Sequence, residues 1–195
     1  MSKTYWMLVV DQENLDITRL NGFSVQGVDS RNRRKAVRMT PEDRIIYYVS
    51  DRRGFAATAT VGSEHFEDHS RIWKDYRPEE DFPNRVKISA DVVLYPQDYV
   101  DARELAPTLE YLKKWPAELW ELAFFGMLHI MPQRDFNLLE EEIKKADEAA
   151  VVRRESETPR PSSVPASAAA SRRRQKKKAQ TVRRRRRTRA KSGSK

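Results

Sequence analysis

The chain has 195 residues, with 38 Lys and Arg, 29 Asp and Glu, and no cysteine. The absence of cysteine excludes thiol nucleophiles, thiolate zinc sites and disulfides. The six glycines form neither GxGxxG nor GxxxxGKS/T, so no glycine-rich nucleotide motif indicates a cofactor, and none is expected. The net charge of +9 is uneven, because residues 1–150 carry 21 basic and 27 acidic side chains, whereas residues 172–195 carry 14 basic and no acidic ones.

This charge distribution predicts three regions. We expect a folded domain over residues 1–148, a Ser, Pro and Ala linker over residues 149–171, and a disordered Lys/Arg-rich tail over residues 172–195. The tail has almost no apolar side chains whose burial could offset the entropy of ordering. No secretory signal and no apolar stretch of membrane length is present, so we expect an intracellular protein without a membrane partner.

The first elements follow from local composition. "TYWMLVV" at residues 4–10 is aromatic and β-branched, which is typical of a buried strand. A short helix is expected within residues 11–22, with Asn14 or Asp16 as its cap and Gly22 as its end.

The next segment predicts a strand, a basic helix and a hairpin. "FSVQGV" at residues 23–28 favours a short strand, and Asp29 and Ser30 are good caps for a strongly basic short helix or helical loop. Residues 45–49 and 55–61 are typical of two strands joined around "SDRRG".

The rest of the body alternates loops, one long strand and helices. Residues 65–84 predict a polar, acidic and mobile loop, and residues 85–96 predict the longest strand. Short helical turns are expected within residues 102–126 and a last short strand at residues 127–131. Residues 132–150 predict a closing amphipathic helix with an apolar face formed by Phe136, Leu139 and Ile143.

Together these elements predict an α+β domain. About six short strands with two to four flanking helices in roughly 145 residues favour a strongly curved mixed sheet or small barrel with helices outside it. A doubly wound parallel sheet is disfavoured because strands and helices do not alternate regularly.

Three segments resemble the EVE domain family in order and spacing. They are "YW" at residues 5–6, "RMTPEDRIIYYVS" at 38–50 running into "FAATATV" at 55–61, and "FFGMLHIMPQRDFNLLEEEI" at 124–143. The resemblance spans about residues 4–145 and implies a PUA-like fold related to the YTH domain. It also implies a pocket that takes up a flipped or single-stranded nucleobase, often a modified one, in DNA or RNA.

A reader of an extruded base needs aromatic walls, polar groups for the base edge and cations for the flanking phosphates. We predict a base pocket formed by Trp6, Asn32, Tyr47, Tyr48, Ser50 and Trp120. We predict phosphate-binding cations at Arg31, Arg33, Arg34, Lys35, Arg38, Arg52 and Arg53 and, in the tail, at Arg183, Arg184, Arg185, Arg186 and Arg187.

Each of these assignments has a structural alternative. Neighbouring strand residues point to opposite faces, so one of Tyr47 and Tyr48 can pack in the core while the other faces the pocket, and the sequence does not say which. Trp6 is as compatible with a core as with a pocket. The basic run can be a solvated helix face. Four aromatic residues of the segment at 102–126 favour the core, namely Trp115, Trp120, Phe124 and Phe125. Trp120 can also close a pocket wall.

The leading prediction is a monomeric, non-enzymatic nucleic-acid-binding protein that reads a modified base and is held on the polymer by its tail, in the cytoplasm, on the nucleoid, or in a nucleus. One alternative is a metal-dependent nuclease or base-processing enzyme that uses His65 and His69, although "HFEDH" is not the HExxH pattern and no metal site is predicted. Another is a nucleoid- or ribosome-associated architectural protein that acts through its tail. His129, in an apolar strand, is expected to be a hydrogen-bonded core residue, and no catalytic residue is predicted.

Overall fold

The computed structural model describes residues 3–157, so the predicted tail and most of the predicted linker lie outside the described residues. The strands are β1 (Tyr5–Val10), β2 (Val25–Val28), β3 (Arg44–Val49), β4 (Gly54–Val61), β5 (Phe66–Glu67), β6 (Asn84–Val93), β7 (Val100–Asp101) and β8 (Leu128–Ile130). The helices are α1 (Gln12–Leu20), η1 (Ser30–Asn32), α2 (Arg33–Ala36), η2 (Pro96–Asp98), α3 (Ala102–Leu105), η3 (Ala106–Thr108), η4 (Glu110–Leu112), η5 (Ala117–Phe124) and α4 (Gln133–Glu157). All the strands lie in one compact unit, Met1–Arg154.

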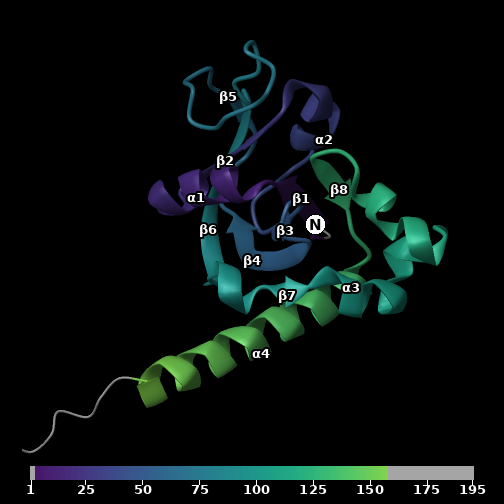
Figure 1. The fold of residues 1–195 in the computed structure, drawn as a ribbon. Helices are drawn as coiled ribbons and strands as arrows, with labels where there is room; N and C mark the ends of the chain where they lie inside the picture. Colours follow the sequence, from purple (N-terminus) through teal and green to yellow (C-terminus); the bar gives the residue numbers. More distant parts are fainter. Residues whose placement is uncertain (1–2, 158–195) are drawn as a thin grey trace, which may run out of the picture. The chain divides into compact units, whose positions relative to one another are not determined.

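The strands form a curled mixed sheet with the order β2-β6-β4-β3-β1-β8, to which β5 and β7 are added at β6 and β4. This confirms the predicted fold class (Figure 1). β1 and β3 run parallel, with Val10 opposite Val49, while the other strand pairs are antiparallel. The carboxyl ends of β1 and β3 therefore meet at the same edge of the sheet.

The two faces of the sheet carry separate apolar clusters, because successive strand side chains alternate. Trp6 and Leu8 belong to the inner cluster, which α1 covers through Leu15, whereas Met7 belongs to the outer one. Tyr47 is in the inner cluster and Tyr48 in the outer one, and both are almost fully buried. The fold thus uses both tyrosine rings as core.

The first helix starts immediately after β1. Its cap is Asp11, whose carboxylate accepts a hydrogen bond from the Asn14 backbone N–H at 2.7 Å, so the predicted caps Asn14 and Asp16 were wrong. Both lie inside the helix because no loop separates it from the strand. The side chain of Asn14 instead binds the backbone of Lys74, 60 residues further along the chain.

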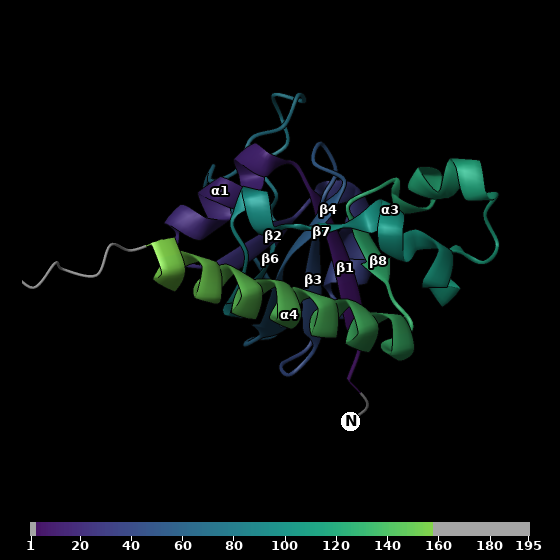
Figure 2. The same ribbon diagram turned by 60° about the horizontal axis from the view of Figure 1, so that its bottom comes forward.

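The closing helix α4 covers the outer cluster and lies across the sheet (Figure 2). The predicted apolar face is confirmed, because Phe136, Leu139 and Ile143 are buried. α4 continues to Glu157, so the predicted domain boundary at residue 148 falls inside this helix.

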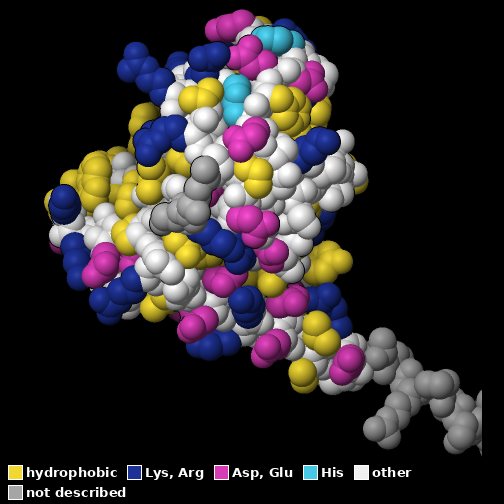
Figure 3. All heavy atoms as spheres, turned by 180° about the vertical axis from the view of Figure 1, so that it is seen from behind, with side chains coloured by type: hydrophobic (Ala, Val, Ile, Leu, Met, Phe, Trp, Pro, Cys, Tyr) yellow, Lys and Arg dark blue, Asp and Glu magenta, His cyan; other side chains and the backbone are white. Residues whose placement is uncertain are grey.

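The segment between β7 and β8 is a chain of short helices, as predicted. Phe124 is buried against Tyr48, with ring centroids 4.7 Å apart. The prediction of a core position was wrong for Phe125, which is 88 % exposed, and for Trp115, which is 42 % exposed. At Phe125 the backbone leaves η5 in an extended conformation, which turns this ring away from Phe124. Hydrophobic side chains gather on the edge of the molecule that this segment forms (Figure 3).

Among residues 3–157, no helix is both long enough and apolar enough to cross a membrane.

Candidate functional site: a cavity at the ends of the parallel strands

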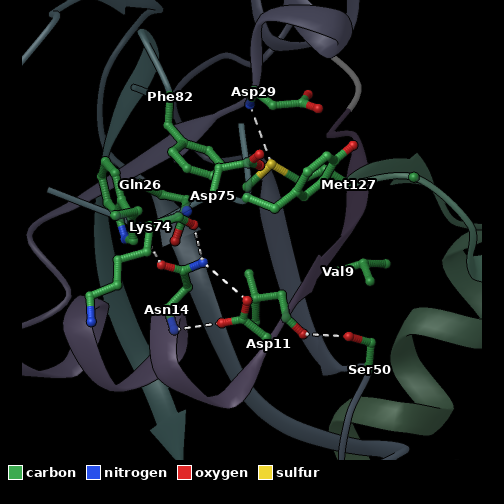
Figure 4. A pocket seen from close by; sticks show the side chains of 14 residues that line it. Val9, Asp11, Asn14, Gln26, Asp29, Ser50, Lys74, Asp75, Phe82 and Met127 are labelled. Carbon is green, nitrogen blue, oxygen red and sulfur yellow. Dashed lines mark hydrogen bonds between the residues drawn. The ribbon is translucent and has the colours of Figure 1, made fainter. Parts of the chain in front are cut away.

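A cavity of about 240 Å³ opens where β1 and β3 end, beside the first turn of α1 (Figure 4). Its wall is completed by β2, by the loop before β6 and by the loop before β8. The lining residues are Val9, Val10, Asp11, Asn14, Gln26, Asp29, Ser50, Trp73, Lys74, Asp75, Tyr76, Phe82, Gly126 and Met127. Met127 is held in place because its carbonyl accepts a hydrogen bond from the Val9 N–H at 2.8 Å. The carboxyl ends of parallel strands are a common place for ligand sites.

Trp73 forms a rigid part of the wall. It is 5 % exposed, and its indole N–H donates to the Thr18 hydroxyl at 2.8 Å. A Cβ atom at position 27 would lie 2.4 Å from the Trp73 ring and 2.9 Å from Cβ of Phe82, so only glycine lets the ring pack against β2. Arg85 lies over the Trp73 ring, 5.3 Å from its centroid.

Asn14 ties the wall to α1. Its amide donates to the Lys74 carbonyl at 2.8 Å and accepts from the Lys74 N–H at the same distance, which is the pattern of a backbone pair. The loop before β6 is therefore held against α1 by one side chain. Asp11 stands beside it with its carboxylate exposed at the cavity mouth.

A charge cluster lies behind the other wall, centred on Arg77. Its guanidinium contacts Asp75 at 2.8 Å, Glu80 at 3.3 Å and Asp29 at 3.7 Å. The hydrogen bonds and positive charge of Arg77 hold the pKa of Asp75 below its usual range. The positive charge of Arg31 also contributes to lowering the pKa of Asp75.

Gln26 connects the cavity to the core. It is 1 % exposed, donates from its amide to the Gly27 carbonyl at 2.8 Å and accepts from the Tyr47 hydroxyl at 2.9 Å. Burial strongly raises the pKa of Tyr47, so its phenol remains a hydrogen-bond donor at neutral pH. Tyr47 therefore supports the cavity from behind without lining it.

Of the six residues predicted for the base pocket, Ser50 is the one that lines this cavity within the described part of the chain. Trp6 is buried, and its indole N–H donates to the Asp43 carboxylate at 2.9 Å. Asn32 lies behind the lining, where its amide donates to Asp29 at 2.7 Å.

Trp120, with Trp115, lines a second cavity of about 330 Å³, next to η5. The structure therefore divides the predicted base-pocket residues between the core, the first cavity and this second one.

The predicted phosphate-binding cations fall into two groups. Arg31, Arg34 and Arg38 are exposed and, within residues 3–157, form no ion pair. The others have partners: Arg33 pairs with Glu67, Lys35 donates to the Leu128 carbonyl, Arg52 contacts Asp51 and Arg53 contacts Glu121. The five predicted tail arginines lie outside the described residues.

The three histidines have separate hydrogen-bond partners. His65 contacts the Asn84 side chain at 3.2 Å and His69 contacts Asp81 at 2.9 Å. No group of three or more metal-ligating side chains occurs in the part of the chain that the structure describes. The predicted core role of His129 is confirmed, because it is 8 % exposed and bonds the Tyr111 hydroxyl at 2.9 Å. Burial lowers the pKa of His129, so the ring is neutral at pH 7.

Sequence reasoning missed the aromatic residues of the loop before β6. Trp73, Tyr76 and Phe82 occur in a stretch that is otherwise polar and acidic, and large aromatic residues in such a stretch were the available signal. The position of this loop at the cavity depends on hydrogen bonds to α1, from Trp73 to Thr18 and between Lys74 and Asn14, which local composition does not reveal.

The curled mixed sheet, with helices outside it and a cavity at the strand ends, defines a PUA-like domain. The EVE domain pattern matches residues 4–142, which is more than half of the chain, and the chain belongs to the EVE domain family. A UPF0310 protein from Pyrococcus abyssi is 27 % identical over 148 residues, which is 70 % of this chain and 97 % of that protein.

Solved structures share the fold at low sequence identity. The YTH domain of Mmi1 in complex with RNA superposes with a TM-score of 0.56 at 12 % identity, covering 76 % of this chain and 86 % of that one. Human THYN1 in complex with DNA that contains 5-methylcytosine gives a TM-score of 0.50 at 17 % identity, covering 72 % and 98 %.

Proposed function

We propose that this protein is a non-enzymatic reader of nucleic acid whose cavity takes up one flipped or single-stranded, modified base. The observation that carries the proposal is the cavity itself, which combines aromatic, sulfur and polar groups at the ends of β1 and β3. At about 240 Å³ it is smaller than the roughly 300–1,000 Å³ typical of sites for drug-sized ligands. A single flat base suits this space better than a dinucleotide or a cofactor.

The polar lining favours a base that presents N–H groups. The carboxylates of Asp11, Asp29 and Asp75 already accept bonds from Asn14, Asn32 and Arg77, but each has further lone pairs, as has the Ser50 hydroxyl. The Gln26 amide N–H instead donates to a carbonyl. Exocyclic amino groups of cytosine and adenine supply the matching donors, and uracil and thymine offer fewer.

Base uptake by the cavity needs additional affinity, which cationic side chains can supply by binding phosphates. Stacking contributes about 1–3 kcal/mol per base and base extrusion costs a few kcal/mol, so the cavity alone gives little net affinity. Phosphate contacts from exposed arginines near the cavity, and from the 14 basic residues at 172–195, would supply sequence-independent affinity. The domains of Mmi1 and THYN1, with the same fold, have been solved bound to RNA and to methylated DNA, which supports nucleic acid as the ligand class.

The test is a competition titration of the full chain against short single strands and duplexes with plain cytosine, methylcytosine, hydroxymethylcytosine or methyladenine, at two salt concentrations. A preference of about tenfold, or 1.4 kcal/mol, that survives the higher salt is expected. Equal affinities for all the oligonucleotides, lost at the higher salt concentration, would reject base reading and favour an architectural role for the tail.

Tyr76 offers a direct test of the cavity. It lines the cavity and is 83 % exposed, so Tyr76→Ala should weaken binding to the preferred oligonucleotide without lowering the free energy of unfolding. The expected loss is about 1–3 kcal/mol, the range for one stacked base. Phe125→Ala is the matched control, because this ring is 88 % exposed and lies outside the lining.

A further inference from the structure

The cavity has a negative interior. Its lining includes Asp11, Asp29 and Asp75, whose carboxylates bond Asn14, Asn32 and Arg77 respectively, and Glu80 stands behind them against Arg77. Arg77 neutralises one of these four charges, and the lining cation Lys74 is paired with Glu13 outside the cavity. Even with the partial positive charge of about +0.5 at the start of α1, negative charge exceeds positive charge inside the cavity.

The segment beside the cavity carries the opposite charge. Directly after Asp29, residues 30–38, which contain η1 and α2, present the exposed side chains of Arg31, Arg34 and Arg38. Arg31 follows the lining residue Asp29 by two positions, so the positive surface begins beside the cavity wall. A ligand that fits both features carries a positive charge on its flat, inserted part and negative charges on the part that remains outside.

We propose, building on the function proposed above, that the cavity selects bases whose methyl group makes the ring a cation, such as 3-methylcytosine or 1-methyladenine. The phosphates of the same strand then face the arginines of η1 and α2. A trimethylated lysine side chain also suits aromatic and acidic surroundings, but a lysine-rich peptide would bring further positive charge against these arginines.

Partial burial strengthens this selectivity. Asp29 and Glu80 are less than 9 % exposed, and Asp75 is half-buried, so their field reaches a base in the cavity through less water than a surface charge would. Arg85 over one side of Trp73 is the opposing positive charge, and its guanidinium is itself paired with Asp68 at 2.7 Å. Met127 adds a polarisable sulfur to the same wall.

Isomeric bases separate charge from size. Short single strands that contain 3-methylcytosine or 5-methylcytosine differ only in the position of the methyl group and therefore in charge, and 1-methyladenine and N6-methyladenine form a second such pair. In competition titrations of the full chain at constant salt, we expect the cationic isomer of each pair to bind about tenfold more tightly or better.

Two charge-neutralising variants test whether the lining carboxylates produce the preference for cationic bases. Asp11→Asn and Asp29→Asn keep a side-chain oxygen that can cap α1 and η1, since Asn is as good a cap as Asp. Each should reduce the preference for the cationic isomer several-fold while leaving the melting temperature nearly unchanged. Asp16→Asn, which removes the same charge from α1 outside the lining, should leave the preference intact.

The outcomes are distinct. Equal or tighter binding of the neutral isomers would overturn the cation preference and leave base reading in place. Binding that does not distinguish any modified base from its plain counterpart would overturn both proposals. Binding of a trimethyllysine peptide in competition with the oligonucleotides, more tightly than any of them, would overturn this proposal by assigning the cavity to a protein tail.

Discussion

At the scale of single residues, Tyr47 shows how a core residue acts on the cavity. Its hydroxyl is the donor to Oε1 of buried Gln26, and Gln26 lines the cavity. Tyr47→Phe leaves that oxygen without its donor, and we expect the free energy of unfolding to fall by about 1–3 kcal/mol. Urea unfolding measures this loss, and base selectivity should also weaken because the Gln26 amide is then held only by its bond to the Gly27 carbonyl. Unchanged selectivity in the folded variant would show that the fixed amide has no role in recognition.

The two buried tyrosines also predict a loss of stability at alkaline pH. Burial, with the nearby Glu121, raises the pKa of Tyr48 to about 12, while an unfolded tyrosine ionises near pH ~10. The stabilisation from keeping this phenol neutral is complete below about pH 10 and is lost as the pH rises towards about 12. Unfolding curves should therefore shift to lower urea in this window, and less so in Tyr48→Phe. Tyr76→Phe, which alters an exposed ring, should behave like the parent.

At position 27, a single added methyl group should disturb the cavity wall directly. A methyl group there would overlap the Trp73 ring at 2.4 Å, so Gly27→Ala must displace the ring or the strand. We expect a loss of about 1–3 kcal/mol in unfolding free energy and a loss of base selectivity. Gly62→Ala is the matched control, because its nearest contact is the Lys87 carbonyl oxygen at 3.7 Å. If both variants lose stability equally, the close fit of Trp73 on β2 is not what limits position 27.

At the scale of elements, the sequence is a good guide wherever periodicity and composition are local properties. The first strand, the hairpin at 44–61 and the face of α4 follow from such patterns, and all are present. The predicted caps of α1, Asn14 and Asp16, lie three and five residues after the actual cap, Asp11, because strand and helix adjoin without a loop. The cavity was not predictable in this way, since Asn14 meets Lys74 and Gly27 meets Trp73 only after the sheet has formed.

The length of α4 gives a prediction at the same scale. Its last turns carry Arg153, which binds the buried carboxylate of Asp98 at 2.7 Å, and Arg154, which lies 5.0 Å from the ring centroid of Tyr95. A fragment that ends at residue 148 lacks these contacts, and we expect it to be less stable than a fragment that ends at residue 157. Arg153 is half exposed, so solvent weakens its ion pair with Asp98. We therefore expect the shorter fragment to lose about 1–2 kcal/mol of unfolding free energy, or roughly 2–8 °C in melting temperature.

Two point variants check this explanation. Arg153→Ala in the full chain should show part of the same loss, while Arg134→Ala, which removes an exposed pair with Glu110, should have almost no effect. Equal melting temperatures for the two fragments would show that α4 beyond residue 148 does not stabilise the fold.

At the scale of the whole molecule, the proposed function divides nucleic-acid binding between the acidic body and the basic segment at residues 172–195. The body has six more acidic than basic residues over 1–150, so it repels a polyanion at long range, while residues 172–195 attract it. In the same proposal, the exposed arginines that follow Asp29 orient the strand at short range. Under the proposed function, this division would let a net acidic domain bind a polyanionic ligand.

Deleting residues 158–195 separates the two contributions. The shortened chain should bind every oligonucleotide more weakly and with a smaller salt dependence, by about 0.7 in the log–log slope for each single-strand phosphate that the tail neutralises. Its ratio of affinities for modified and plain bases should stay the same, because the cavity residues all lie before residue 128. Equal affinity with and without the tail at low salt would exclude phosphate binding by the tail. A selectivity that disappears with the tail would mean that base discrimination does not reside in the cavity.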